Sequence, residues 1–379
     1  MKEQRIVRGI FCLFVIAVAS CAQSKSAGRL TVEKSISPIS WGRCLSQKPE
    51  FYASDEAIRI ADNVLLYQRD TGGWPSNINM TVKLTENEKD KIRNAKGKED
   101  STFDNGASHT HLRYLAKVYN ATRLERFKQG FYNGVDYLLK AQYANGGWPQ
   151  TYPSLRGYSK YITFNDGAMI GAMSVLRDIA CKKPQYAFVG EDRRRRAEKA
   201  VQKGVECILN CQIVVDGKKT AWCAQHDENT FAPRKARSYE LPSISGAESV
   251  GIVRFLMSID KPDPEIIEAV QIAVAWFDHV RLTGIRQINK PDESLEGGYD
   301  EVIVEDATAS PIWARFYQIR TNRPIFCGRD GEVKYRLAEI EHERRTGYAW
   351  YGYWPADLLT RDYSDWQKKW APGKNVLGN

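Results

Sequence analysis

Residues 142–149 read Gln-Tyr-Ala-Asn-Gly-Gly-Trp-Pro, and residues 68–75 read Gln-Arg-Asp-Thr-Gly-Gly-Trp-Pro. The tryptophans of these stretches, Trp74 and Trp148, are 74 residues apart, and Trp222 follows at the same interval in a looser third copy. A fixed period with a recurring turn is typical of a repeat architecture. The sequence therefore predicts a unit made of a helix, a Gly-Gly-Trp turn and a second helix.

Apolar residues recur at helical spacing before each of these turns. The segments that carry this pattern are residues 56–67, 132–142 and 200–212, with a fourth at 266–280. Partner helices are predicted where a polar residue precedes Gly-Ala, at residues 104–107, 166–168 and 245–247. Strand signals are few, and the two short ones at 213–215 and 302–304 suit minor hairpins. We expect a mainly α protein, an incomplete α/α toroid in which inner and outer helices alternate, with a few short strands.

The first residues resemble an export signal. Lys2, Arg5 and Arg8 precede a short apolar run at residues 10–19, which is too short for a permanent membrane-spanning helix. The run ends in Val-Ala-Ser-Cys at residues 18–21, which resembles a bacterial lipoprotein cleavage site.

We therefore expect a signal peptide over residues 1–20, lipidation of Cys21, and a membrane attachment through that lipid. Simple secretory cleavage nearby is the alternative. Residues 21–50 are predicted to be a tether, and residues 51–379 to be the catalytic domain. The expected location is the bacterial outer membrane, cell surface or periplasm, and the expected state is a monomer.

The composition suits an exported protein with an acidic ligand. The 379 residues are 42% hydrophobic and 27% charged, with a net charge of +9. Loss of residues 1–20 removes three basic groups and one acid, so the mature chain keeps a charge of +7. Outside the cell, such a basic balance favours a polyanionic polysaccharide over nucleic acid. Of eight cysteines, Cys12 lies in the signal and Cys21 is the expected lipidation site, and the other six are expected to be structural because no pair has zinc-ribbon spacing.

Two acids stand in corresponding phrases before predicted inner helices. Asp104 lies in Thr-Phe-Asp-Asn-Gly-Ala and Asp166 in Thr-Phe-Asn-Asp-Gly-Ala. An aspartate before a helix is a good N-cap, which is one interpretation. The other is that both carboxylates point into one groove and hold a hard cation, with Ca²⁺ completing its coordination from water and a substrate carboxylate.

Basic residues cluster in three loops of the second half of the chain. Lys235 and Arg237 follow the third tryptophan turn, Arg315 follows Trp313, and Arg329 lies in Gly-Arg-Asp-Gly. An arginine fork can bind a carboxylate through two hydrogen bonds, which suits a uronic acid. The alternative for Arg315 is that it only stacks or pairs within the fold.

These phrases, in this order, resemble the family-ten pectate lyases of the polysaccharide lyase classification. The resemblance runs from about residue 56 to residue 370 and includes the three tryptophan turns and both acidic phrases. It continues through the segments at residues 239–245, 313–316, 322–326, 328–331 and 344–352.

The resemblance implies calcium-dependent cleavage of α-1,4-polygalacturonate by β-elimination, which yields 4,5-unsaturated oligogalacturonates. It implies these roles: Asp104 and Asp166 around calcium; Arg329 as general base; Arg315, Arg237, Asn105 and Lys235 as substrate contacts. An arginine is normally protonated. A basic role therefore requires surroundings that strongly disfavour its charge.

Three other functions remain open at this point. The repeat phrase also resembles that of triterpene cyclases, but the chain has no Asp-x-Asp-Asp proton donor. An inverting glycosidase could use Asp104 and Asp166 as its acid and base. A non-catalytic lipoprotein could capture pectin fragments without cleaving them.

Overall fold

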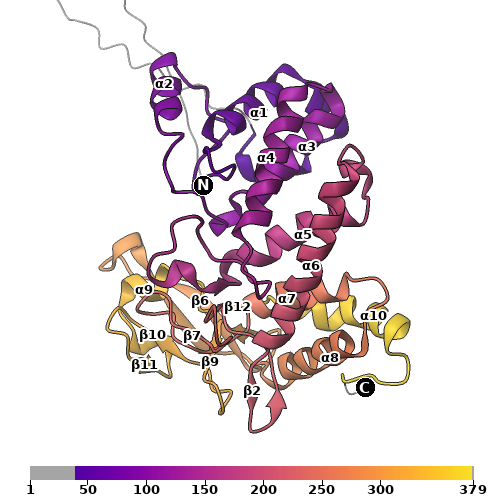
Figure 1. Cartoon of the computed structure of the whole chain (residues 1–379). Coiled ribbons are helices and arrows are strands. Elements are labelled where there is room, and N and C mark those ends of the chain that lie inside the picture. The colour runs from indigo at the N-terminus through magenta and orange to yellow at the C-terminus, as the bar shows by residue number, and fades with distance from the viewer. Residues whose placement is uncertain (1–38, 378–379) are drawn as a thin grey trace, which may run out of the picture. The chain divides into compact units, whose positions relative to one another are not determined.

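The structure is a computed structural model that describes residues 39–377, and its main helices form two layers. The outer layer comprises α1 (Asp55–Tyr67), α4 (Glu125–Ala141), α6 (Glu191–Cys211) and α8 (Pro264–His279). The inner layer comprises α3 (His109–Thr122), α5 (Ala168–Ala180) and α7 (Glu248–Met257). Each helix contacts the next member of its own layer, and the pairs α3–α4, α5–α6 and α7–α8 join the layers. Figure 1 shows this progression from α1 to α8. The alternation confirms the predicted α/α toroid.

The remaining elements are short. The other α-helices are α2 (Glu86–Asn94), α9 (His342–Thr346) and α10 (Tyr363–Trp370), the last preceded by a π-helical turn, η9 (Leu358–Asp362). Turns of 3₁₀-helix are η1 (Trp41–Ser46), η2 (Pro49–Ala53), η3 (Asp104–Gly106), η4 (Gly157–Lys160), η5 (Asn165–Gly167), η6 (Pro184–Tyr186), η7 (Glu296–Gly298) and η8 (Leu337–Glu339).

The strands are β1 (Ile162–Thr163), β2 (Val214–Val215), β3 (Lys218–Lys219), β4 (Gln225–His226), β5 (Ile244–Ser245), β6 (Ile285–Pro291), β7 (Tyr299–Glu305), β8 (Trp313–Ala314), β9 (Phe316–Tyr317), β10 (Phe326–Cys327), β11 (Val333–Lys334) and β12 (Tyr351–Gly352). All pair in antiparallel twos. The predicted minor hairpins are present as β2–β3 and β6–β7.

Local chemistry fixes where two of the outer helices, α1 and α8, begin. The Ser54 side chain accepts a hydrogen bond from the Ala57 N–H at 3.2 Å, and Asp263 does the same for α8. Pro264 follows at the first position of α8, where a missing N–H costs nothing. The apolar faces of the helices of both layers then meet in one continuous buried cluster.

The repeated tryptophans anchor each turn to the outer helix that precedes it. Trp74, Trp148 and Trp222 are fully buried. Their indole N–H groups donate to the carbonyls of Val64, Leu138 and Ile208 at 2.7, 2.8 and 2.7 Å. Trp313 makes the same bond to Phe277 of α8 at 2.8 Å, which identifies it as a fourth member of the series.

The repeated glutamines join each turn to the next outer helix. The Gln68 amide donates to Gly72 within its own turn and to Gly130 of α4, at 2.8 and 2.9 Å. Gln142 repeats this with Gly146 and Ala200 of α6, and Gln212 with Thr220 and Ala269 of α8. We call these three contacts the glutamine bridges. They explain why glutamine recurs, since one amide group satisfies two buried carbonyls.

Another repeated contact positions the start of the inner helices. The backbone N–H groups of Thr102, Thr163 and Ser245 donate to the carbonyls of the three repeat tryptophans at 2.9, 3.0 and 2.7 Å. Each of these three residues also pairs, in an antiparallel bridge, with the residue three positions after the next tryptophan of the series. The partners are Thr151, Gln225 and Phe316. The polar phrases that follow are therefore presented from equivalent places in the repeat.

The folded domain begins before residue 51. Within η1, Cys44 is completely buried, and the Trp41 ring stacks on His111 with 5.1 Å between ring centroids. The prediction of a tether over residues 21–50 is therefore wrong at its C-terminal end, because the folded domain already includes η1. Its earlier part, the signal segment and Cys21 lie outside the described residues. Among residues 39–377, no helix has the length and apolarity to cross a bilayer, and the cysteines form no disulfide.

Candidate active site

Asp104 and Asp166 lie on two 3₁₀ turns, η3 and η5, that pack against each other. Asp104 Oδ1 is buried and has no hydrogen-bond partner among the described residues. Burial raises the pKa of Asp166, and the nearby charge of Asp104 raises it further, although Arg315 opposes the shift. The expectation that the structure brings both carboxylates to one place is thus met.

The two acids do not occupy equivalent backbone positions. Asn105 and Asp166 share the left-handed conformation, with φ of 49° in both, so Asp166 corresponds to Asn105 and Asp104 to Asn165. Asparagine and aspartate tolerate this conformation better than most residues. The exchange of Asp-Asn for Asn-Asp places one carboxylate on each turn at neighbouring, non-identical points.

Helix capping does not account for these aspartates. The N-caps of α3 and α5 are Ser108 and Gly167, and neither cap makes a side-chain hydrogen bond. Asp104 instead has Asn105 as a partner of Oδ2 at 3.3 Å, and Asp166 has Asn165 at 2.6 Å. The capping interpretation is therefore wrong, and the carboxylates are free for another role.

Arg315 lies beside this acidic pair. It stands between β8 and β9, and its Nη2 is 3.9 Å from Asp166 Oδ1 and in closer contact with Glu248 Oε1. Its guanidinium also lies 4.8 Å from the centre of the Tyr348 ring. With its side chain only 12% exposed, Arg315 is held at a fixed place between two acids.

Arg237 is held in the same way by a second glutamate. Its Nε donates to Glu240 Oε2 at 2.8 Å, and the Tyr348 hydroxyl donates to Glu240 Oε1 at 2.8 Å. Burial is the largest influence on the pKa of Glu240 and would raise it, but the hydrogen bonds and charge of Arg237 and the hydrogen bond from Tyr348 together lower the pKa. Tyr348 therefore contacts both arginines, since the Arg237 guanidinium lies 5.6 Å from its ring centre.

Arg329 lies on the turn between β10 and β11, and a third glutamate engages it. Its Nη2 and Nε donate to Glu343 at 2.8 and 3.1 Å, and its side chain is 61% exposed. The hydrogen bond and charge of Glu343 raise the pKa of Arg329. The implied base role requires surroundings that disfavour the charge of Arg329. The structure instead surrounds Arg329 with groups that favour its charge.

Two other predicted contacts lie at the edges of the site. Asn105 is exposed and donates to Asn77 at 3.2 Å. Lys235 lies against Gly331, where an added Cβ would be 3.3 Å from Nζ. The loop of Arg237 and the turn of Arg329 are therefore neighbours through Lys235.

Sequence reasoning missed the acidic partners of the arginines. Glu240, Glu248 and Glu343 each bind one predicted arginine, and Tyr239 and Tyr348 supply the rings between them. Glu240, Tyr239 and Tyr348 stand inside phrases that carry the family resemblance. Their position in these phrases was the one signal that could have marked them as site residues. A glutamate near an arginine in the sequence does not by itself show that the two side chains pair.

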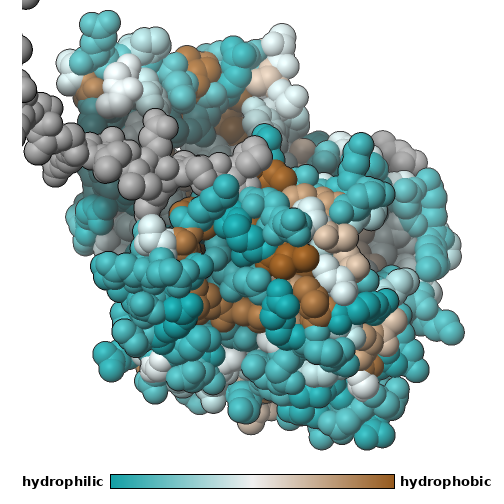
Figure 2. Space-filling model, turned by 90° about the horizontal axis from the view of Figure 1, so that it is seen from above, coloured by the Kyte–Doolittle hydropathy of each residue, from teal (hydrophilic) through white to brown (hydrophobic). Residues whose placement is uncertain are grey.

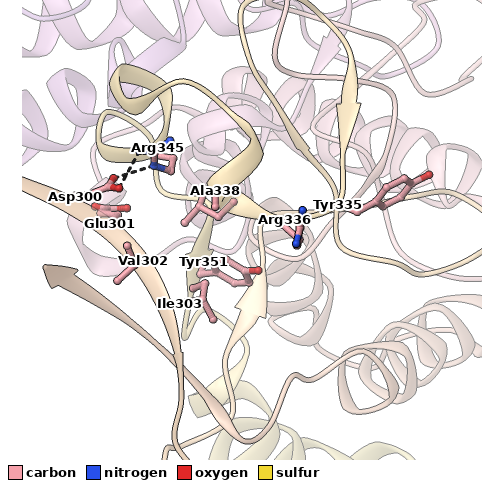
Figure 3. Close-up of a pocket in the computed structure, with 10 residues that line it drawn as sticks. Asp300, Glu301, Val302, Ile303, Tyr335, Arg336, Ala338, Arg345 and Tyr351 are labelled. Carbon is pink, nitrogen blue, oxygen red and sulfur yellow. Dashed lines mark hydrogen bonds and ion pairs between the residues drawn. The ribbon is translucent and has the colours of Figure 1, made fainter. Parts of the chain in front are cut away.

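A cavity of about 530 Å³ lies beside this region and contains none of the predicted site residues. Figure 3 shows Asp300 and Arg345 at one end and Tyr335 and Arg336 at the other, with apolar side chains between them. In the face shown in Figure 2, hydrophobic side chains gather near the middle of an otherwise mostly hydrophilic surface. The charged side chains of the cavity are Asp300, Glu301, Arg336 and Arg345, of which Asp300 and Arg345 are bound to each other at 2.8 Å. We assign the chemistry to the acid and arginine cluster, because it holds two neighbouring aspartates, one with a buried oxygen that has no partner among the described residues.

Comparisons with known proteins agree with this architecture. The model of the pectic acid lyase family matches residues 68–359. A family 10 polysaccharide lyase from Cellvibrio cellulosa is 35% identical, with a TM-score of 0.72 over 87% of this chain and 94% of that one. An aspartate-to-alanine mutant of the Cellvibrio enzyme, in complex with trigalacturonic acid, is 34% identical, with a TM-score of 0.71 over 87% and 96%. No curated protein matches.

The fold and the site define an α/α-toroid enzyme with paired carboxylates beside arginines. The chain belongs to the pectic acid lyase family, and within it to the family 10 polysaccharide lyases. It is a pectate lyase.

Proposed function

We propose that this protein cleaves α-1,4-polygalacturonate by calcium-dependent β-elimination. The observation that carries the proposal is the placement of Arg315 beside the paired turns of Asp104 and Asp166. With a cation held by the two aspartates, this arrangement would offer positive charge and an arginine fork to the same uronate carboxylate. The structurally similar Cellvibrio mutant, in complex with trigalacturonic acid, supports an acidic galacturonide as the ligand.

The acidic residues suit a calcium ion. The unpartnered Asp104 Oδ1 and the desolvated Asp166 are hard oxygen donors whose charges repel, and a cation would relieve that repulsion. The described residues contain no group of three acidic, histidine or cysteine side chains able to hold a metal. Coordination would therefore be completed by water and substrate, which suits Ca²⁺ with its six to eight oxygen ligands. When bound, calcium supplies positive charge at the carboxylate of the reacting sugar.

The arginines orient the substrate and stabilise its charge. The C5 proton of galacturonate is α to a carboxylate, so negative charge develops there as the proton leaves. Arg315 is fixed by Glu248 where its fork can face that carboxylate, and Arg237 is fixed by Glu240 for a neighbouring sugar. The rigid pairing means that little reorganisation is needed during the reaction.

Proton transfer is assigned to Arg329, in line with the family resemblance. The C5 proton passes to a nitrogen of Arg329 in its neutral guanidine form, which becomes the guanidinium; the C5–H electron pair forms the C4–C5 double bond, and the C4–O4 bond breaks. The leaving oxygen takes a proton from water, and the hydroxide formed returns Arg329 to its neutral form. Because Glu343 raises the pKa of Arg329 in the free protein, this role requires the pairing to weaken when substrate binds.

Absorbance of an unsaturated product tests the proposal. The purified protein is incubated with polygalacturonate, first with calcium and then with a chelator. We expect the ultraviolet band of the 4,5-unsaturated uronate to grow only with calcium. Reducing ends without this band would indicate a hydrolase that uses Asp104 and Asp166 as acid and base. Binding without any cleavage would indicate a capture protein.

Export and attachment are proposed from the sequence alone. A lipid on Cys21 would tether the enzyme at the membrane surface, where it would meet pectate fragments as a monomer. These statements stay predictions, since residues 1–38 lie outside the described part of the chain.

A further inference from the structure

Glu343 differs from the other glutamates of the site because two arginines share its carboxylate. Arg329 donates to Oε1 and Oε2 at 2.8 and 3.1 Å. Arg344 donates to Oε2 at 2.7 Å through Nε and contacts Oε1 through Nη2. Two guanidinium forks therefore enclose one carboxylate. This is the arrangement in which two arginines would bind a uronate carboxylate of a substrate.

The helix that carries Glu343 is firmly held. Arg345 of α9 makes two hydrogen bonds of 2.8 Å to Asp300 of β7, drawn as dashed lines in Figure 3. His342 contacts the Tyr299 carbonyl at 2.8 Å, and the Trp350 indole donates to the Arg344 carbonyl at 2.7 Å. Asp300 and Arg345, whose pairing holds α9 in place, thus also line the cavity in Figure 3. Glu343 is presented from a fixed backbone.

The backbone of Arg329 is held as well, by Glu341. The Arg329 N–H donates to Glu341 Oε1 at 2.6 Å. A Cβ at Gly328 would lie 2.0 Å from Glu341 Oε2, so a larger residue there would displace this carboxylate. The start of the turn is therefore fixed, and the freedom of Arg329 is confined to its side chain.

The two arginines bound to Glu343 differ in exposure. The Arg344 side chain is 10% exposed and its guanidinium lies 4.7 Å from the Tyr239 ring centre, whereas Arg329 is 61% exposed and 6.0 Å from the same ring. Arg344 can therefore retain Glu343 when Arg329 leaves. Because Arg329 is 61% exposed, solvent screens its pairing with Glu343, and substrate binding can break that pairing at small cost.

We propose that Glu343 holds Arg329 in a resting position in the free enzyme, and that the bound substrate releases Arg329 from it. The inference rests on the proposed function. Glu343 is a positioning residue in this account, because it acts on the reaction only through Arg329. It keeps the arginine ordered and charged until a polygalacturonate chain arrives.

The charged groups around Arg329 determine in which direction the loss of Glu343 should shift the pKa of Arg329. Glu343 and Glu341 are acidic and stabilise its charge, and the hydrogen bond from Arg344 lowers the pKa of Glu343 and so keeps that carboxylate charged. Lys235 and Asp330 lie at the same turn, and Tyr239 lies beneath it. Glu343 has the largest effect on the pKa of Arg329 and raises it. Removal of this carboxylate charge therefore lowers the pH at which Arg329 can accept a proton.

The test compares Glu343→Gln with wild type in the calcium-dependent lyase assay across pH. We expect KM for polygalacturonate to fall by about two- to fivefold, the scale of an exposed ion pair. We also expect the rising limb of the kcat/KM profile to move by about one unit to lower pH. Glu339→Gln is the matched control, since Glu339 binds one arginine, Arg336, away from the site. It should leave both quantities unchanged.

Several outcomes would overturn the inference. A profile for Glu343→Gln that superimposes on wild type would do so. A raised KM with an unmoved limb, restored by Glu343→Asp, would show a purely structural role. Thermal melting of each variant checks that the fold is kept. If wild type itself releases no unsaturated uronate, the proposed function fails, and that result differs from a wild type that is active while Glu343→Gln behaves identically.

Discussion

At the scale of the residue, the central feature is a pair of carboxylates placed together before any cation is bound. Asp166 has Asn165 and the more distant Arg315 as partners, while Asp104 Oδ1 has none among the described residues. Desolvated and mutually repelling acids destabilise a fold. Their retention is the expected cost of a site made to bind positive charge.

We expect Asp166→Asn to abolish lyase activity while making the calcium-free protein more stable above pH 3.8. The pKa of Asp166 is raised from 3.8 in the folded protein, by burial first, with a further contribution from Asp104. In the window above 3.8 the folded state therefore holds a proton that the unfolded state has lost. Wild type loses this stabilisation as pH rises through the window, and Asp166→Asn does not. Melting curves against pH measure the difference.

Calcium provides the second half of that experiment. A ligand at 100 times its dissociation constant stabilises the folded state by about 2.7 kcal/mol, so the melting temperature of wild type should rise with calcium. Asp166→Asn should lose this rise. Equal calcium stabilisation of both proteins would place the ion elsewhere.

The sequence singled out acids and arginines that lie near one another in the structure, but it did not single out their partners. Asp104, Asp166, Arg237, Arg315 and Arg329 stand in recognisable phrases, so their importance is visible in one dimension. Pairing is a three-dimensional property. Glu248 is 67 residues from the arginine it binds, and no periodicity reports such a contact. The sequence also does not show that Asp104 and Asp166 occupy different positions on their turns, because that difference is defined by the backbone angles.

At the scale of the element, the repeated turn depends on glycine where two segments touch. Gly146 has a φ of 92°, and a Cβ there would lie 1.9 Å from the Lys203 carbonyl oxygen of α6. Gly72 repeats this against Asn133 of α4, at 2.3 Å. The Gly-Gly of the motif is thus a packing requirement as well as a turn requirement.

We expect Gly146→Ala to destabilise the protein by at least about 2 kcal/mol, because it adds a steric clash to a strained φ. Gly217→Ala is the control, since Gly217 has a φ of 77° with open space around its Cα. Urea unfolding of both variants separates the two effects. Equal losses would mean that the contact with α6 contributes nothing.

The outer helices were predictable because their turns use side chains that few residues can replace. Tryptophan supplies one buried indole N–H and glutamine a two-donor amide, so both recur at the period of the fold. The extent of the domain was less visible. Trp41 and Cys44 precede the first periodic helix, and their burial depends on α3.

At the scale of the whole molecule, the net charge of +9 matches a polyanionic substrate. Long-range attraction raises the local concentration of such a polymer and is screened over about 10 Å at 0.1 M salt. We expect KM for polygalacturonate to rise with added sodium chloride at fixed calcium, while kcat changes little. Kinetics at a series of salt concentrations measure this. A KM independent of salt would mean that only short-range contacts recognise the substrate. As a control, an unchanged melting temperature across the salt series would show that the rise in KM does not come from unfolding.

The glutamine bridges also set an order of assembly. Each bridge joins a turn to a helix that comes later in the chain, 62, 58 and 57 residues after the glutamine. A chain that emerges with its N-terminus first could therefore close the bridge of Gln68 before the last outer helix has emerged. The sequence order of the bridges allows the toroid to close unit by unit from its N-terminal end.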